Sequence, residues 1–264
     1  MKSKYEYYLN QGIHFERGDC IDLLKEIPDQ DIPLILQDPP YGITQNPYDT
    51  KIDLKRLSKE WIRVLKPNGA LILFAQQLFA TDLINCLRDL YRYNMIWQKG
   101  ERTTGFLNCN KMPLRNHEEI LVFYKSLPVY NPQFTIGEPT HKRGTSTKNT
   151  NNNYGKFDIV PQKEMGNKKY PKSVLNFERP HPPIHPTQKP VDLMKWLINT
   201  YSNPGDIVFD GFVGSGTTPL ACIETERRFI GAEIHPPYYN MAVERIKAAL
   251  SLREINHSNN SIRK

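Results

Sequence analysis

The sequence has few cysteines and no long apolar run. Its 264 residues include four cysteines, which are far apart and form no C-x-x-C pair. They are therefore interpreted as reduced thiols and not as a disulfide framework. No apolar stretch approaches the roughly 18 residues that span a bilayer, and the first residues lead into no signal-like apolar segment. We expect a cytoplasmic protein without a membrane segment.

A metal site is also not expected. His181 and His185 are four residues apart, which on a helix would place both rings on one face. The prolines that stand beside and between them forbid that helix, so a zinc site of this geometry is excluded.

Negative charge is scarce in one segment of the chain. The net charge is +7, and residues 131–180 hold nine Lys or Arg against four Asp or Glu. Residues 145–153 contain no apolar side chain, so a disordered linker is one interpretation. Aromatic residues such as Tyr154 and Phe157 favour instead a partly ordered element that binds a polyanion. We therefore expect an inserted region at 131–180 and one larger domain formed by residues 1–130 and 181–264.

Strand-like and helix-like segments alternate through the rest of the chain. This alternation predicts an α/β fold in which helices cover both faces of a doubly wound, mostly parallel sheet. Segments 94–98 and 120–124 are separated by a loop without helical periodicity, so we expect an antiparallel hairpin at one sheet edge. The other expected strands are 13–17, 32–37, 70–75, 207–209 and 229–233, and the expected helices are 20–27, 54–65, 78–90, 191–201, one from 217, and 238–252.

A polar loop follows the apolar strand that ends at Gln37. Its residues are Asp38, Pro39, Pro40 and Tyr41. The prolines could simply end the strand, with the aspartate capping the turn. The loop also suits a binding task, because an ionised carboxylate offers only acceptors and a proline-flanked carbonyl is held stiffly. These two groups could accept both hydrogens of an exocyclic amine, and the tyrosine ring could stack on a base.

A second loop, at residues 210–218, follows the strand at 207–209. It reads D-G-F-V-G-S-G-T-T and lacks the lysine of a phosphate-binding G-K-[ST] motif. A glycine-rich turn alone is a weak signal, since many α/β proteins use one only to turn the chain. Glu233, however, ends the next strand at the distance where an acid accepts both ribose hydroxyls. The pair indicates a nucleoside-bearing cofactor and does not require a pyrophosphate.

With Asp-Pro-Pro-Tyr in the first loop and the glycine loop after it, the chain resembles the S-adenosylmethionine-dependent DNA amino-methyltransferases. The order, with the catalytic motif first, a variable segment next and the glycine loop last, is that of the beta class. The similarity extends over nearly the whole chain, including V-L-K-P-N-G at 64–69, H-P-T-Q-K-P at 185–190 and F-I-G-A-E at 229–233. It implies a Rossmann-like fold and makes residues 131–180 a target-recognition region.

The resemblance also implies roles in binding S-adenosylmethionine. Glu233 would hold the ribose, and Asp19 would contact the edge of the adenine. Thr187 and Lys189 would help close the carboxylate end, although a lysine is otherwise more often only a solvated charge. The remaining cofactor-binding residues would be those of the glycine loop, Asp210, Phe212, Gly214, Ser215, Gly216, Thr217 and Thr218, among which Phe212 could equally be a packing residue.

The implied reaction is methyl transfer to an exocyclic amine of a base flipped out of double-stranded DNA. In the catalytic loop, Asp38 and the Pro39 carbonyl would accept the amino hydrogens, so that the nitrogen lone pair attacks the methyl group directly. Methylation of cytosine C5 would need a cysteine nucleophile, usually after proline, and no Pro-Cys pair is present. Resemblance to the enzymes that have aspartate at the position of Asp38 favours adenine N6, because in this family serine there more often accompanies cytosine N4.

Several alternatives stay open on the sequence alone. They are cytosine N4 methylation, an RNA or small-molecule methyltransferase on the same scaffold, and a DNA-binding protein that has lost turnover. The basic segment does not separate DNA from RNA, whereas the intact acid at 38 and the intact glycine loop argue against lost activity. The resemblance also allows a homodimer and a cognate restriction endonuclease, in a bacterial or phage-infected cell, but the residues themselves predict neither.

Overall fold

A computed structural model describes residues 5, 12–42, 51–138, 167–184 and 187–262. The chain divides into two compact units, one formed by Met1–Asn131 with Ser173–Lys264 and the other by Pro132–Lys172. Tyr154, Phe157 and His185, which entered the sequence predictions, lie outside the described residues.

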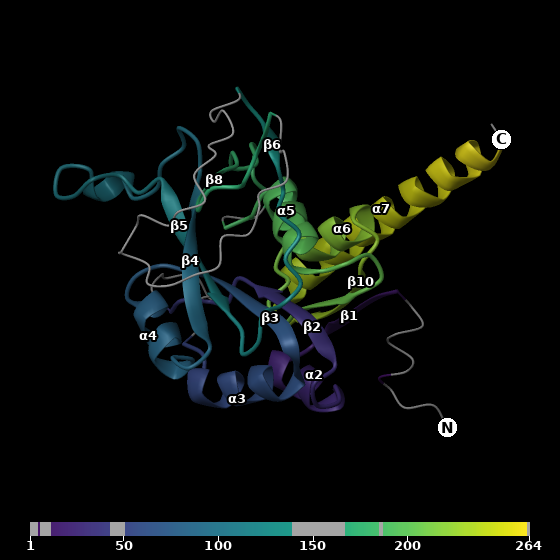
Figure 1. Ribbon diagram of the computed structural model, residues 1–264, viewed down its shortest axis with the longest axis horizontal. Helices are drawn as coiled ribbons and strands as arrows, with labels where there is room; N and C mark the ends of the chain where they lie inside the picture. Colours follow the sequence, from purple (N-terminus) through teal and green to yellow (C-terminus); the bar gives the residue numbers. More distant parts are fainter. Residues whose placement is uncertain (1–4, 6–11, 43–50, 139–166, 185–186, 263–264) are drawn as a thin grey trace, which may run out of the picture. The chain divides into compact units, whose positions relative to one another are not determined.

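The larger unit is built on one eight-stranded sheet, with the order β1-β10-β9-β2-β3-β5-β4-β8 (Figure 1). The strands from β1 to β3 in this order are parallel, β5 is antiparallel to both β3 and β4, and β8 is parallel to β4. The predicted fold class is therefore confirmed, but the β4–β5 hairpin is not the sheet edge, because β8 pairs outside it. The strands are β1 (Ile13–Arg17), β2 (Ile32–Gln37), β3 (Leu65–Ala75), β4 (Tyr91–Gln98), β5 (His117–Phe123), β8 (Val174–Asn176), β9 (Ile207–Asp210) and β10 (Arg228–Glu233).

Helices cover both faces of this sheet. One face packs against α2, α3 and α4, and the opposite face packs against α5, α6 and α7 (Figure 1). Each face has its own apolar core, because side chains alternate along every strand. The helices are α2 (Cys20–Glu26), α3 (Leu54–Val64), α4 (Phe79–Cys86), α5 (Val191–Tyr201), α6 (Thr217–Glu224) and α7 (Pro236–Ile262), with a short 3-10 helix η1 (Phe106–Asn108).

Helix α3 illustrates how the sequence sets these elements. Asp53 precedes it and accepts a hydrogen bond from the Arg56 backbone N–H at 3.0 Å, which satisfies one of the free donors at the helix start. Leu57, Trp61 and Val64 then follow at helical spacing and are buried against the sheet. The cap and the apolar stripe therefore agree on the position and orientation of the helix.

The direction of the chain reverses between β2 and β9. From β2 the chain crosses through α3 to β3 on one side, and from β9 it crosses through α6 to β10 on the other side. The two strands pair directly, with Leu34 opposite Val208 and Ile35 opposite Phe209. Such a reversal opens a crevice at the carboxyl ends of the strands, which is where open α/β sheets bind ligands.

The smaller unit has a short antiparallel pair of its own, β6 (Thr135–Ile136) with β7 (Lys168–Lys169). Next to this pair, the rings of Phe134 and Tyr170 make an edge contact with centroids 5.0 Å apart. The Lys168 ammonium lies 5.9 Å from the Phe134 ring centroid. The described part of this unit therefore holds one strand pair and an exposed aromatic contact beside it. The unit ends before β8, so the last part of the segment at 131–180 contributes a strand to the large sheet.

Among the described residues, no helix is both long and apolar enough to cross a membrane.

Candidate active site

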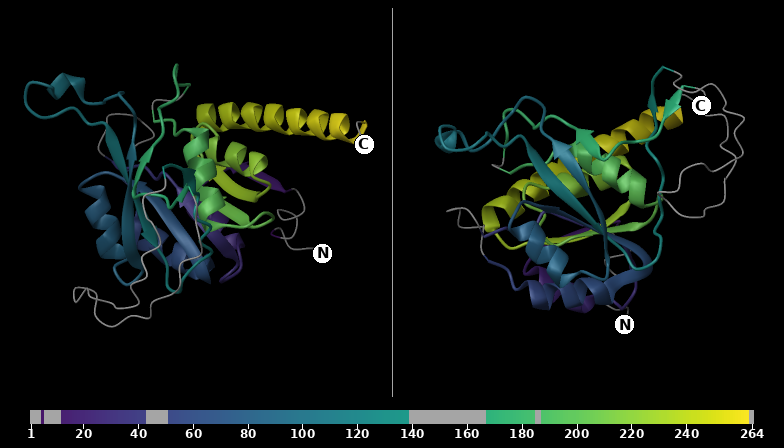
Figure 2. Two further views of the ribbon diagram at one scale, coloured as in Figure 1. Left: turned by 45° about the horizontal axis from the view of Figure 1, so that its top comes forward. Right: turned by 60° about the vertical axis from the view of Figure 1, so that its left-hand side comes forward.

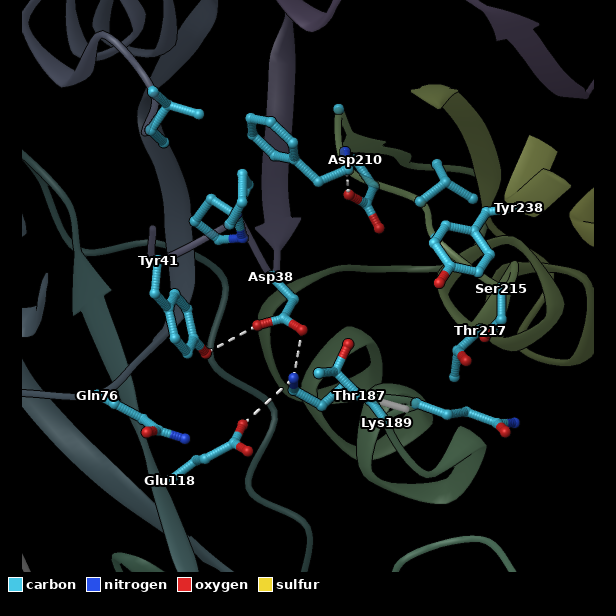
Figure 3. A pocket seen from close by; sticks show the side chains of 18 of the residues that line it. Asp38, Tyr41, Gln76, Glu118, Thr187, Lys189, Asp210, Ser215, Thr217 and Tyr238 are labelled. Carbon is cyan, nitrogen blue, oxygen red and sulfur yellow. Dashed lines mark hydrogen bonds and ion pairs between the residues drawn. The ribbon is translucent and has the colours of Figure 1, made fainter. Parts of the chain in front are cut away.

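The two loops singled out in the sequence meet at the reversal point of the sheet. Asp38 follows the last residue of β2, and Asp210 is the last residue of β9. Both line one cavity of about 1170 Å³ (Figure 3). The loop at 38–41 and the loop at 210–218, which are about 170 residues apart in sequence, therefore share one site.

Two neighbours hold the Asp38 carboxylate. The Tyr41 hydroxyl donates to Oδ1 at 2.8 Å, and the Lys189 ammonium pairs with Oδ2 (Figure 3). The same ammonium lies 3.2 Å from Oε2 of Glu118, whose Oε1 is 2.5 Å from the Lys99 ammonium. The side chains of Lys99 and Lys189 are 3% and 6% exposed, and those of Glu118 and Asp38 are 10% and 22% exposed, so two acids and two lysines form a largely buried cluster.

The cluster sets the protonation of its members. The pKa of Asp38 lies above its ordinary value, because burial, with a contribution from Glu118, outweighs the opposing effects of Lys189 and the Tyr41 hydroxyl. Burial lowers the pKa of Lys189, but Asp38 and Glu118 raise it more strongly, so its pKa ends above the ordinary value. For Glu118, the two ammoniums outweigh burial and lower the pKa. Lys189 therefore stays charged and favours the carboxylate form of both acids.

Glu118 and Lys99 were not among the sequence candidates. In the sequence, Glu118 belongs to an H-E-E run that indicates only the start of a strand, and Lys99 follows a strand without a motif around it. The antiparallel pairing of β4 with β5, with Trp97 opposite Glu118, brings both to the cavity. Lys189 was expected at the cofactor, whereas its ammonium is on Asp38 and Glu118; its role toward the cofactor stays a prediction.

The glycine loop is organised around Asp210. The residue is 2% exposed, and its carboxylate accepts hydrogen bonds from the Phe212 backbone N–H at 2.9 Å and the Thr218 hydroxyl at 2.5 Å. Burial raises the pKa of Asp210 to about 7, and the carboxylates of Asp38 and Glu233 add to this rise. The deprotonated form of this acid would therefore be stabilised by a positively charged ligand in the cavity.

Glu233 is oriented by the backbone on both sides of it. Its Oε2 accepts from the Gly214 N–H at 2.7 Å, and its Oε1 accepts from the His235 N–H at 2.8 Å. The residue is 7% exposed and lines the cavity. Such a fixed carboxylate retains free lone pairs, as an acceptor for a pair of hydroxyl groups requires.

Most other predicted residues also line this cavity. Asp19 does so while it caps α2, accepting from the Ile21 N–H at 2.7 Å, so a structural role is established for its carboxylate. Gly216 is not among the lining residues. It stands at the start of α6 with φ of 87°, and a side chain there would come within 3.0 Å of Ala242. The remaining predicted residues at the cavity are Pro39, Pro40, Tyr41, Thr187, Lys189, Phe212, Gly214, Ser215, Thr217 and Thr218.

The glycine-loop half of the cavity fits S-adenosylmethionine, which carries a nucleoside and a positive charge. The Thr217 hydroxyl is buried and has no hydrogen-bond partner among the described residues, although Thr217 lines the cavity. The charged groups that act on Asp210 are carboxylates, which suits a cationic ligand. The described residues contain no cluster of His, Cys, Asp or Glu that could hold a metal ion.

Fold and cavity together define an α/β protein whose ligand cavity has two halves, one formed by the glycine loop and the other by the loop that carries Asp38. The chain belongs to the family of DNA methylases described as N6_N4_Mtase, whose model matches residues 32–244. This match confirms the resemblance to the DNA amino-methyltransferases, and it includes both loops.

Individual relatives agree with this assignment. The chain is 31% identical over 250 residues to the type II methyltransferase M.HpaI of Haemophilus parainfluenzae, and this alignment covers 87% of this chain and 72% of that protein. It is also 31% identical over 259 residues to the DNA adenine methyltransferase YhdJ of Escherichia coli (strain K12), and this alignment covers 91% of this chain and 84% of that protein.

Solved structures show the same fold. The M1.HpyAVI–SAM complex superposes with a TM-score of 0.62 at 24% identity, over 89% of this chain and 98% of that chain. The cytosine-N4-specific PvuII DNA methyltransferase superposes with a TM-score of 0.64 at 17% identity, over 89% and 90%. At these identities the likeness concerns the fold alone.

Proposed function

We propose that this DNA methylase transfers a methyl group from S-adenosylmethionine to N6 of adenine in double-stranded DNA. The observation that carries the proposal is the shared cavity, in which the Asp38 carboxylate of the Asp-Pro-Pro-Tyr loop and the glycine loop with Asp210 and Glu233 lie together. One half of the cavity offers hydrogen-bond acceptors for an amine, and the other half offers a binding site with carboxylates for a cationic nucleoside.

S-adenosylmethionine supplies a methyl group that is electrophilic because it is bonded to a sulfonium. Glu233 binds the ribose hydroxyls with a carboxylate that two backbone N–H groups already orient. A positive charge bound nearby would favour the ionised form of Asp210, and this carboxylate would in turn strengthen binding of the cationic cofactor. Thr217 adds a buried hydroxyl that is otherwise without a partner among the described residues.

Asp38 acts on the target base. An adenine amine is a weak nucleophile because its lone pair is delocalised into the ring, and it becomes accessible only when the base is flipped out of the stack. Asp38 and the Pro39 carbonyl accept its two hydrogens and localise the lone pair on nitrogen. Lys189 opposes the rise in the pKa of Asp38 and so favours its carboxylate form, and the Tyr41 hydroxyl fixes the orientation of that carboxylate. The reaction needs no covalent enzyme intermediate, so alignment supplies much of the acceleration.

Adenine is favoured over cytosine by the residue at position 38. The resemblance associates aspartate with adenine N6 and serine with cytosine N4, and position 38 holds aspartate. A relative named as a DNA adenine methyltransferase is 31% identical to this chain, which supports the same choice. Cytosine N4 is the alternative, because the same acceptors could hold either exocyclic amine.

The basic segment at 131–180 is proposed as the target-recognition region. Its excess of lysine and arginine suits a polyanion, and base specificity would come from side chains that reach base edges. The catalytic domain is then formed by residues 1–130 and 181–264, with β8 of the sheet supplied from the end of the recognition segment.

Product analysis tests the proposal. The protein is incubated with S-adenosylmethionine labelled in the methyl group and with unmethylated plasmid DNA, the same DNA after heat denaturation, or RNA. Each product is then digested to nucleosides. We expect label in N6-methyldeoxyadenosine from native DNA. Label only in N4-methylcytosine nucleoside would refute the adenine assignment, and label only in RNA, or in no nucleic acid, would refute DNA methylation by this protein.

A further inference from the structure

The connection between β4 and β5, residues 99–116, is an ordered loop that projects from the sheet (Figure 2). At its base, the Thr104 and Arg115 backbones exchange two hydrogen bonds, of 2.7 and 3.1 Å. At its tip, the turn of η1 is closed by bonds from the Asn108 N–H to Gly105 and from the Cys109 N–H to Phe106, at 2.9 and 3.1 Å. The backbone therefore holds the tip in a defined shape without an apolar core of its own.

The tip exposes large apolar side chains. Phe106 is 72% exposed and Leu107 is 83% exposed, and Met112 and Leu114 on the returning strand of the loop are 54% and 41% exposed. Scattered exposed apolar residues are common, but four on one short loop form a patch that a binding partner would cover. None of these four side chains belongs to either apolar core of the larger unit.

The same loop forms part of the wall of the catalytic cavity. Leu107, Met112 and Arg115 line the cavity that contains Asp38. Arg102, Lys111 and Arg115 are exposed on the loop, against one exposed acid, Glu101. The loop therefore presents an apolar tip, a basic flank and a direct connection to the place where the target amine must arrive.

We propose that residues 106 and 107 at the tip of the β4–β5 loop enter the DNA duplex beside the target pair and fill the space that the flipped base leaves. This inference rests on the proposed function. Phe106 and Leu107 stack against the bases that remain in the duplex, while Lys111 and Arg102 contact phosphates on either side. The loop thereby offsets part of the free energy of unstacking, and the extruded base passes along the loop into the cavity.

Duplex DNA fits this surface better than a protein partner does. A base step opened by flipping is flat and apolar between two rows of phosphates, which matches an apolar tip flanked by cations. A protein partner, or a second copy of this chain, would match the apolar tip alone. It would also cover the mouth of the cavity on the side that the loop lines, where the substrate has to enter.

The test compares a loop variant with a matched surface variant on two substrates that differ in the free energy needed to flip the target base. The loop variant is Phe106→Ser/Leu107→Ser. The surface variant is the control Leu127→Ser, which replaces a 76% exposed leucine that does not line the cavity. The substrate is a short duplex built around the position that the wild type methylates in unmethylated plasmid DNA. A second duplex has an abasic site opposite the target base, so that the base is already unpaired.

On the fully paired duplex, we expect kcat/KM of the double variant to fall about tenfold or more, because the apolar side chains that fill the space of the flipped base are lost. On the duplex with the abasic site, we expect most of this loss to disappear, while Leu127→Ser matches the wild type on both. Equal losses on both duplexes, no loss on either, or a change of oligomeric state without the substrate dependence would overturn the inference. Absence of transfer by the wild type itself would instead refute the proposed function.

Discussion

Replacing Asp210 by asparagine should stabilise the cofactor-free protein, and more strongly at alkaline than at acidic pH. The side chain is 2% exposed, and an amide of the same shape can keep both of its contacts. Its oxygen can accept from the Phe212 N–H, and its NH₂ group can donate to the Thr218 hydroxyl oxygen. The substitution therefore removes the buried charge with little change in packing.

The sign follows from the two pKa values of Asp210. The carboxyl group has an ordinary pKa of 3.8, and burial raises it to about 7 in the folded protein. The folded state therefore binds the proton more tightly, so the stabilisation is fully present below the unfolded pKa and is lost as pH rises through the folded pKa. The full difference corresponds to about 4 kcal/mol, and about 2 to 3 kcal/mol of it is lost between pH 5 and pH 8.

The assay is urea unfolding of both proteins at pH 5 and pH 8 without cofactor. We expect the advantage of Asp210→Asn in unfolding free energy to grow by about 2 to 3 kcal/mol from pH 5 to pH 8. Asp82→Asn, at an exposed carboxylate on α4, serves as the control and should show no such growth. An advantage of Asp210→Asn that is independent of pH, or one that shrinks toward pH 8, would refute the reasoning.

Two further substitutions probe the two halves of the cavity. Glu118→Gln removes a carboxylate that raises the pKa of Asp38 and leaves Asp38 as the remaining charged partner of Lys189. The acidic limb of the pH–activity profile should therefore move to lower pH. An unchanged acidic limb would contradict the coupling between Glu118 and Asp38. Gly211→Ala places a Cβ 2.0 Å from the Cys20 sulfur and should lower stability by about 1 to 3 kcal/mol in thermal melting. Cys20→Ala added to Gly211→Ala should recover part of that loss. A melting temperature of Gly211→Ala equal to that of the wild type would contradict the prediction, because it would mean that the loop moves to accept the Cβ without a loss of stability.

Elements with a clear local pattern were predictable from the sequence. The predicted bounds of β1, β2 and α5 agree with the structure, because an apolar run or a helical stripe with sharp ends defines each of them. Strand β3 begins at Leu65, five residues before the predicted start at residue 70, because residues 66–69 read as a turn. Ile32 of β2 pairs with Leu65 and Leu34 pairs with Ala70, so a register shift accommodates the polar stretch within the strand. No local sequence pattern predicts such a shift.

The site was predictable where a motif carries it and not where tertiary pairing creates it. The acid at 38 and the glycine loop are recognisable because each follows an apolar strand. Glu118 and Lys99 reach the cavity only through the pairing of β4 with β5, and the contact of Lys189 with Asp38 joins positions 151 residues apart. Side-chain charge partners across such separations depend on the folded sheet, so the sequence pattern alone could not assign them.

The central claim is that Asp38 acts on the target amine and that the cofactor is held by other residues of the same cavity. The most direct measurement combines calorimetric titration of S-adenosylmethionine with methyl transfer to DNA, for Asp38→Ala and for Asp22→Ala, which removes a carboxylate that is 72% exposed on α2. The account predicts that Asp38→Ala binds the cofactor nearly as the wild type does and loses transfer by about 100-fold or more, while Asp22→Ala retains both. Normal transfer by Asp38→Ala, or a loss of transfer fully explained by lost cofactor binding, would contradict it.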